Sequence, residues 1–133
     1  MTKILFIILL SFISISAIAK DKKAIIFEKN TPVKLYRLGG DMTNVRENVD
    51  LNVDPYKKAV GHNQNLVEGI STTSKEPSGT NFCTIESKSK IPKDIKLIKD
   101  PVDSEHYLWA PTKVMRLEAF KTLMGNIPCE PKK

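Results

Sequence analysis

The stretch FCTIESK, residues 82–88, alternates between apolar and polar side chains and holds one of the two cysteines of the chain. The period of two predicts a half-buried strand, with Cys83 and Ile85 facing inward and Thr84, Glu86 and Lys88 facing outward. Its counterpart, Cys129, lies 46 residues further on, in NIPCEPKK. In an oxidising compartment this pair predicts a disulfide that fastens the C-terminal tail to the middle of the domain. Two unpaired buried thiols are the alternative.

The first 19 residues, MTKILFIILLSFISISAIA, predict a cleaved signal peptide. Lys3 precedes an apolar run, and Ala17-Ile18-Ala19 has the small-x-small pattern that signal peptidase recognises. The run is shorter and richer in serine than the roughly 20 apolar residues of a membrane-spanning helix, and an uncleaved anchor is the alternative. Cleavage after Ala19 therefore predicts a periplasmic or secreted protein, formed by residues 20–133 as a single β-rich domain without a membrane span.

Short apolar or alternating segments separated by turn residues predict a mostly antiparallel sheet. In residues 48–53, for example, Val49, Leu51 and Val53 share one face of a half-buried strand. STTSKEPSGTN, residues 71–81, has no apolar residue and predicts a loop. The predicted strands are 24–28, 33–38, 48–53, 65–72, 82–88, 94–99 and 106–110.

The period then changes to that of a helix. Val114, Leu117, Phe120, Leu123 and Met124 recur at steps of three and four, which predicts one apolar stripe on a helix over about 113–124. Thr112 is the candidate N-cap, and Gly125-Asn126 ends the helix. The predicted fold class is α+β: a small, mostly antiparallel β-sheet domain with one C-terminal α-helix and one disulfide.

The segment YLWAPTKVMRL, residues 107–117, resembles the closing segment of bacterial SH3-like domains, in which a tryptophan, a small residue and a proline precede the last strand. LNVDPYKKAVG, residues 51–61, is similar to an earlier strand and turn of those domains, although Asp54 stands where their strand has an arginine. The resemblance implies an all-β barrel as the alternative fold, with residues 113–117 as a strand instead of a helix.

The residues that could carry chemistry are few. Serine, glutamate and histidine are neighbours at 104–106, and neighbours in an extended chain point to opposite sides, so they form no relay with one another. A zinc site needs about three or four ligands. The chain has only two histidines, His62 and His106, and its two cysteines are not free to bind zinc if they form a disulfide. Asp50, Asn52 and Asp54 resemble the start of a calcium loop, but the glycine and the closing glutamate of such a loop are missing. We therefore expect no metal, no cofactor and no enzymatic activity; a hydrolase with an unrecognised pair of acids is the remaining alternative.

Two surfaces are candidates for binding. The segment KSKIPKDIKLIK carries Lys88, Lys90, Lys93, Lys96 and Lys99 against a single acid, and such a cluster would attract an anionic partner. Lysines also protect exposed edge strands from pairing, which is the alternative role. Tyr107 and Trp109 share one face of their strand and form either an aromatic binding platform or part of the core.

The formal net charge of +6 falls to +5 when the segment containing Lys3 is removed. An exported protein rarely meets nucleic acid, so the charge points to an anionic envelope surface or an acidic partner. The sequence predicts a non-catalytic exported binding protein of the bacterial envelope, acting as an inhibitor or neutraliser of a partner protein. A cell-wall or glycan-binding module that uses Tyr107 and Trp109 is the alternative. The expected partners are an envelope protein or an anionic wall component.

Overall fold

A computed structural model describes residues 24–48, 50, 52–53, 58–60 and 69–133 of the 133-residue chain. The predicted signal peptide lies outside the described residues. Within these ranges, no helix is long and apolar enough to cross a membrane. The described residues form a small antiparallel β-sheet domain with one short helix and one disulfide.

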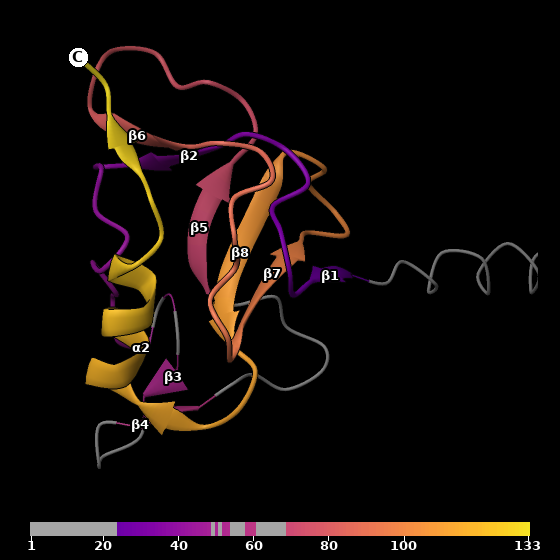
Figure 1. The fold of residues 1–133 in the computed structure, drawn as a ribbon, viewed down its shortest axis with the longest axis vertical. Helices are drawn as coiled ribbons and strands as arrows, with labels where there is room; N and C mark the ends of the chain where they lie inside the picture. Colours follow the sequence, from indigo (N-terminus) through magenta and orange to yellow (C-terminus); the bar gives the residue numbers. More distant parts are fainter. Residues whose placement is uncertain (1–23, 49, 51, 54–57, 61–68) are drawn as a thin grey trace, which may run out of the picture.

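Seven strands make the main sheet of the described residues, in the order β1-β7-β8-β5-β2-β6-β10, with every pairing antiparallel (Figure 1). Three short strands, β3, β4 and β9, form a second sheet. The strands are β1 (Ile25–Phe27), β2 (Leu35–Leu38), β3 (Asn52–Val53), β4 (Lys58–Val60), β5 (Ile70–Thr73), β6 (Phe82–Ile85), β7 (Ile95–Lys99), β8 (His106–Pro111), β9 (Met115–Arg116) and β10 (Glu130–Pro131).

The main sheet bends sharply between β5 and β2. These two strands share a single pair of facing residues, Tyr36 and Thr73, whereas β5 and β8 share four. In Figure 1, β2 and β6 accordingly lie across the direction of β5 and β8 instead of continuing beside them. The bend leaves a gap in the hydrogen-bonded ladder beyond Tyr36 and Thr73.

The loop predicted over 71–81 begins later than expected. Ser71, Thr72 and Thr73 are the last three residues of β5, and only the residues from Ser74 to Asn81 connect this strand to β6. Ser71 and Thr72 were also part of the strand predicted over 65–72, so the loop prediction was wrong for all three hydroxyl residues and the strand prediction was right for the first two. The burial of the three side chains still alternates as expected for a strand, because Thr72 is buried whereas Ser71 and Thr73 are half-buried. Threonine is in any case a good strand former.

The helix is shorter than predicted and begins at a different residue. Helix α2 spans Leu117–Gly125, and its N-cap is Arg116 without a side-chain hydrogen bond, so Thr112 does not cap it. Met115 and Arg116 pair instead with Ala59 and Lys58 of β4, which holds the backbone extended up to the start of the helix. Of the predicted stripe, Leu117, Phe120 and Met124 are buried, but Val114 lies outside the helix and is 55% exposed.

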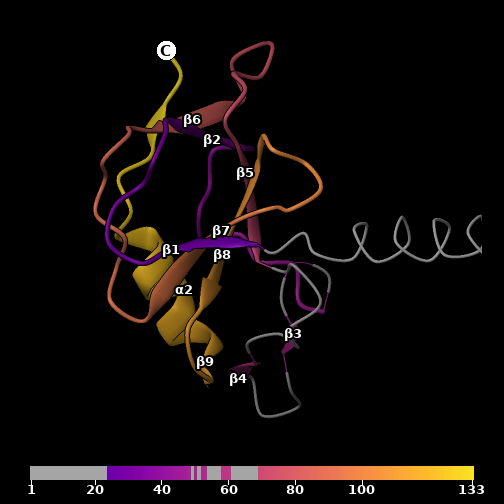
Figure 2. The same cartoon turned by 90° about the vertical axis from the view of Figure 1, so that its right-hand side faces the viewer.

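The SH3-like alternative predicts a longer strand before the C-terminus than the structure has, because only two of its five predicted strand residues form a strand. It predicts a strand over 113–117, and β9 covers Met115–Arg116 alone before the chain turns into α2. The α2 helix then packs on the inner side of the bent sheet (Figure 2). The α+β prediction therefore describes the domain better, with the helix as a minor component.

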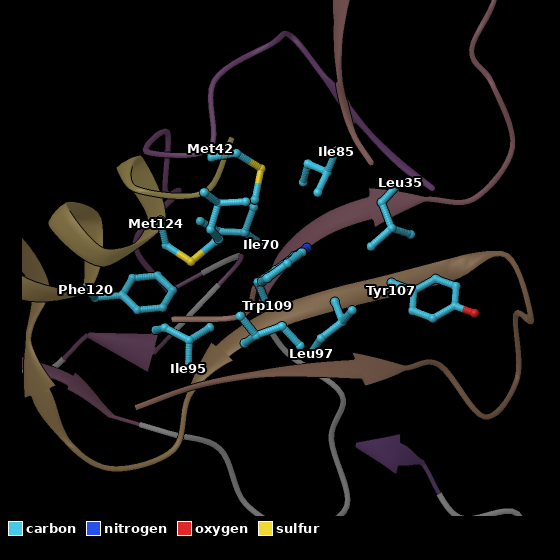
Figure 3. Close-up of a cluster of buried hydrophobic side chains, with 12 residues drawn as sticks. Leu35, Met42, Ile70, Ile85, Ile95, Leu97, Tyr107, Trp109, Phe120 and Met124 are labelled. Carbon is cyan, nitrogen blue, oxygen red and sulfur yellow. The ribbon is translucent and has the colours of Figure 1, made fainter. Parts of the chain in front are cut away.

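The core fills the inner side of the bent sheet around Trp109. In Figure 3 the Trp109 ring lies between Ile70 and Leu97, and Phe120 and Met124 reach toward it from α2. The indole N–H of Trp109 donates a hydrogen bond to Thr72 Oγ1 at 3.1 Å, and the Thr72 hydroxyl donates to the Tyr107 carbonyl at 2.9 Å. The Thr72 hydroxyl and the Trp109 indole N–H, which β5 and β8 bring into the core, are thereby satisfied.

The disulfide between Cys83 and Cys129 is present, with 5.2 Å between the two Cα atoms. Cys83 is fully buried, in β6. The chain after Cys129 continues as β10, in which Glu130 faces Thr84 and Pro131 faces Cys83. The bridge therefore fastens the tail as the last strand of the main sheet.

Candidate functional site

Tyr107 and Trp109, proposed above as a binding platform or as core, are both buried: Tyr107 is 4% exposed and Trp109 is 0% exposed. Both side chains point to the inner side of the sheet (Figure 3). Their aromatic surface is used for packing, so it is not offered to a glycan or a protein partner in this structure.

The five lysines of the second candidate surface separate into two groups. Lys96 and Lys99 lie on opposite faces of β7, because Lys96 faces Ala110 of β8 and Lys99 faces Tyr107. Lys88, Lys90 and Lys93 are exposed and lie near the isolated bridge between Asn30 and Lys90. Lys90 and Lys93 line a shallow hollow of about 440 Å³, together with Glu28, Lys29, Asn30 and Ile91.

A second hollow, of about 300 Å³, opens where β2 and β5 diverge. We call it the β2–β5 hollow. It is lined by Tyr36, Arg37, Leu38, Arg46, Ser71, Thr72 and Thr73. Tyr36 and Leu38 supply apolar surface, and the Tyr36 ring stacks edge-on against Phe82 with 5.6 Å between ring centroids. Arginine and hydroxyl side chains supply the polar part of the lining.

Arg37 holds the divergent strands together. Its guanidinium donates to three backbone carbonyls: Ser71 through Nη1 at 2.9 Å, Asn44 through Nη2 at 3.0 Å, and Asp41 through Nε at 3.2 Å. Burial lowers the pKa of Arg37 from its ordinary value, although nearby Asp50 opposes that shift. A guanidinium has five N–H donors, so two are left over after these three bonds.

Arg46 brings a second guanidinium to the β2–β5 hollow. Its Nη2 lies 2.7 Å from Asp50 Oδ1, and its backbone amide donates to Asp50 Oδ2 at 2.9 Å. Burial raises the pKa of Asp50, but the hydrogen bonds from Arg46 outweigh it, so the pKa of Asp50 lies below its ordinary value. The Asp50 side chain is 6% exposed and that of Arg46 is 69% exposed, so Arg46 is the member of the pair that meets solvent.

The outer face of β5 and β8, opposite the core, carries a chain of three hydrogen-bonding side chains. Ser71 Oγ lies 2.6 Å from His106 Nε2, and His106 Nδ1 lies 3.0 Å from Asp100 Oδ2. Thr73 faces His106 across the ladder, and Ser71, two residues earlier on β5, points to the same face. Ser71 also lines the β2–β5 hollow, so the chain ends at its wall.

Asp100 is held in place by the turn that connects β7 to β8. Its Oδ1 accepts the backbone amide of Val102 at 2.8 Å and that of Asp103 at 3.3 Å, which leaves Oδ2 for His106. Burial raises the pKa of Asp100, but the hydrogen bonds from the Val102 amide, the His106 ring and the Asp103 amide together bring the pKa below its ordinary value.

No cluster of three or more histidine, cysteine or acidic side chains within the described ranges has the geometry to hold a metal ion. Of the calcium-like residues, Asp50 has its carboxylate bound by Arg46, and Asp54 lies outside the described residues. His62 also lies outside them. The expectation that the protein uses no metal stays a prediction.

Sequence reasoning missed the β2–β5 hollow and the chain from Ser71 to Asp100. It considered the serine and the acid next to His106, at positions 104 and 105, whereas the partners of His106 come from β5 and from the end of β7. No protein-family model and no curated protein matches the chain. The geometry of the described residues is therefore what supports a function.

Proposed function

We propose that this protein is exported and binds a small anionic ligand in the β2–β5 hollow. The observation that carries the proposal is the presence of two arginines, Arg37 and Arg46, in the lining of one hollow of about 300 Å³. That volume is at the lower end of the range for small-molecule sites, about 300 to 1,000 Å³. Planar guanidinium donors match carboxylate and phosphate groups.

The acids nearest to the β2–β5 hollow are already engaged. Asp50 is bound by Arg46, and Asp41 accepts both the amide and the hydroxyl of Thr43, at 2.8 and 2.6 Å. These bonds lower the pKa of Asp41, and its carboxylate stays satisfied within its own turn. The lining thus presents N–H donors, hydroxyl groups and the apolar surfaces of Tyr36 and Leu38. A carboxylate or phosphate ester with a small apolar part matches that lining.

Export is part of the same proposal. The disulfide and the lack of an apolar spanning helix among the described residues are compatible with an extracytoplasmic protein. A signal peptide over residues 1–19 would deliver the chain there. Mass spectrometry of the exported protein tests this directly, because cleavage after Ala19 gives Lys20 as the first residue.

Ligand binding is tested by titrating the oxidised protein with inorganic phosphate, pyrophosphate and benzoate while recording backbone amide NMR spectra. We expect saturable shifts at Ser71 and Thr73. The double variant Arg46→Ala with Asp50→Asn removes one charge of each sign, and we expect it to weaken binding at least about tenfold, since a hydrogen bond to a charged group contributes about 1.5–3 kcal/mol.

The matched control is Lys34→Ala with Glu86→Gln, which removes the same two charges from an exposed pair 3.8 Å apart. This control should bind like the unmodified protein. Equal weakening in both double variants, or no saturable shift with any of the three anions, contradicts the proposed site.

A second candidate is binding of an anionic wall polymer at the hollow of about 440 Å³, favoured by the presence of Lys29, Lys90 and Lys93 around a single acid, Glu28. Contacts of this kind weaken with salt, because exposed charges are screened. Co-sedimentation with purified cell wall at low and high salt tests it. Unchanged sedimentation of a Lys90→Gln and Lys93→Gln double variant would contradict it.

A further inference from the structure

Ser71, His106 and Asp100 have the spacing of a nucleophile, a general base and the acid that orients it. The two links of the chain measure 2.6 Å and 3.0 Å, within the range over which protons are transferred between such groups. The His106 and Asp100 side chains are 29% and 19% exposed, so both are partly shielded and still reachable. The three side chains lie on the face of β5 and β8 opposite the core around Trp109, beside a smaller cluster of buried apolar residues that includes Ile98, Leu108 and Ala110.

The partners of Asp100 assign the tautomer of His106. An ionised carboxylate only accepts hydrogen bonds, so the imidazole nitrogen that faces Asp100, Nδ1, carries the hydrogen. In the neutral ring the other nitrogen, Nε2, is then an acceptor, and the Ser71 hydroxyl donates to it. Because the Asp100 pKa lies below its ordinary value, this carboxylate is ionised at neutral pH.

Backbone hydrogen bonds fix the positions of the three residues that carry these side chains. The Asp100 amide donates to the His106 carbonyl at 2.9 Å, which closes the turn between β7 and β8. Ser71 is held by its place in the β5–β8 ladder opposite Leu108, and its carbonyl is bound by Arg37. Rigid strands and turns are what a preorganised site requires.

We propose that Ser71 is the nucleophile of an acyl-transfer reaction, with His106 as general base and Asp100 as its positioning residue, and that the protein hydrolyses small carboxylic esters. The choice of an anionic substrate rests on the proposed binding function of the β2–β5 hollow, but the relay itself does not.

The reaction balances with water as the only co-reactant. Ser71 Oγ forms a bond to the ester carbonyl carbon while its proton passes to His106 Nε2. The tetrahedral intermediate then breaks its bond to the alcohol oxygen, which takes the proton from Nε2 and leaves as the alcohol. Water attacks the acyl-serine and gives a proton to Nε2. When the second intermediate breaks the bond to Ser71 Oγ, that proton returns to the serine and the carboxylic acid is released.

The β2–β5 hollow brings two arginines to the residue that carries the attacking oxygen. Ser71, Arg37 and Arg46 line the same hollow, and the Arg37 guanidinium donates to the Ser71 carbonyl. A guanidinium there serves either the developing oxyanion or a carboxylate elsewhere on the substrate. An ester that carries its own carboxylate should therefore be a better substrate than a neutral ester of similar size.

The test uses the purified, disulfide-intact mature protein with an alkyl fluorophosphonate probe, followed by peptide mass spectrometry. We expect one adduct, on Ser71. Ser71→Ala should abolish labelling, whereas Ser104→Ala should leave it unchanged, since Ser104 is an exposed serine two residues before His106. In parallel, release of 4-nitrophenolate from 4-nitrophenyl acetate and from 4-nitrophenyl hemisuccinate measures turnover.

The roles of His106 and Asp100 are separated by kinetics. His106→Gln and Asp100→Asn should each lower kcat by at least about 100-fold with KM little changed, because neither residue is expected to hold the ground-state substrate. A purely structural role of Asp100 would instead lower the melting temperature and leave kcat per folded molecule unchanged, and that result would overturn its assignment.

The outcomes separate the two proposals. No adduct and no turnover in a protein that melts cooperatively overturns the relay, and anion binding in the NMR titration would then support the proposed function alone. Labelling of Ser71 without anion binding supports the relay and overturns the proposed function. An adduct that persists in Ser71→Ala overturns the assignment of the nucleophile, and if that variant fails to fold, loss of labelling in a folded His106→Gln variant supports the relay.

Discussion

Replacing Thr72 by valine should destabilise the domain although the two side chains have nearly the same shape. The Thr72 hydroxyl accepts from Trp109 Nε1 at 3.1 Å and donates to the Tyr107 carbonyl at 2.9 Å, and the residue is 2% exposed. Valine offers neither bond, so two buried polar groups lose a partner, at about 1–3 kcal/mol each. Burial of the extra methyl group offsets roughly 0.8 kcal/mol. We expect a net loss of about 1–5 kcal/mol, a large part of the roughly 5–15 kcal/mol that a domain of this size possesses.

Urea denaturation followed by tryptophan fluorescence measures this loss, because Trp109 is the only tryptophan in the chain and its buried ring meets solvent when the domain unfolds. The control is Thr72→Ser, which keeps the hydroxyl and removes one methyl group, at a cost of roughly 1 kcal/mol. If Thr72→Val were within about 0.5 kcal/mol of the unmodified protein, or if serine cost as much as valine, the hydrogen bonds would not be the cause. An unchanged m-value would show that the native and denatured states are otherwise comparable.

Three further perturbations follow from the same contacts. Replacing both Cys83 and Cys129 by alanine should lower the free energy of unfolding by about 4 kcal/mol, because the disulfide no longer closes a loop of 46 residues in the unfolded chain. The urea midpoint of this variant should lie below that of the unmodified protein when both are measured in a buffer without reductant. Gly69→Ala should destabilise strongly, since φ is +151° and a Cβ would lie 2.3 Å from the Trp109 carbonyl oxygen; a thermal melt equal to that of the unmodified protein would contradict this. Folding lowers the pKa of Asp50 from 3.8, so the stability that its ionised form contributes is complete well above pH 3.8 and is lost as the pH falls from about 5 through and below 3.8. Asp50→Asn should therefore make the urea midpoint depend less on pH in this range. An unchanged dependence of the midpoint on pH would contradict the role of the Asp50 pair.

The sequence predicted the parts of the fold that depend on local periodicity. Alternation around Cys83 and Ile85 identified β6 and its inward face, and Leu117, Phe120 and Met124 identified the buried side of α2. The start of α2 could not be read in this way, because the pairing of β9 with β4 competes with helix formation at Met115 and Arg116. A partner strand from far away in the sequence decides that boundary.

The candidate site was harder to predict because its residues are brought together only by tertiary structure. Ser71 was assigned both to a strand over 65–72 and to a loop over 71–81, and nothing in the sequence marked Asp100 among the fifteen acids of the chain. Their link to His106 needs both the β5–β8 register and the turn after β7. Arg37 was placed on the correct strand, yet its bonds to the Ser71 and Asn44 carbonyls depend on the divergence of β2 from β5.

Strands β5 and β8 carry the stability of the core and the proposed chemistry on opposite faces. Because side chains alternate along a strand, Thr72 and Trp109 point into the core while Ser71 and His106 point away from it. A substitution on the inner face should therefore lower stability and leave the relay geometry intact. Ile95→Val, at a core residue that does not line the β2–β5 hollow, should label with the fluorophosphonate probe at close to the rate of the unmodified protein when assayed well below its own melting temperature. Loss of labelling in folded Ile95→Val would show that the two faces are coupled, and that the position of Ser71 depends on the packing beneath it.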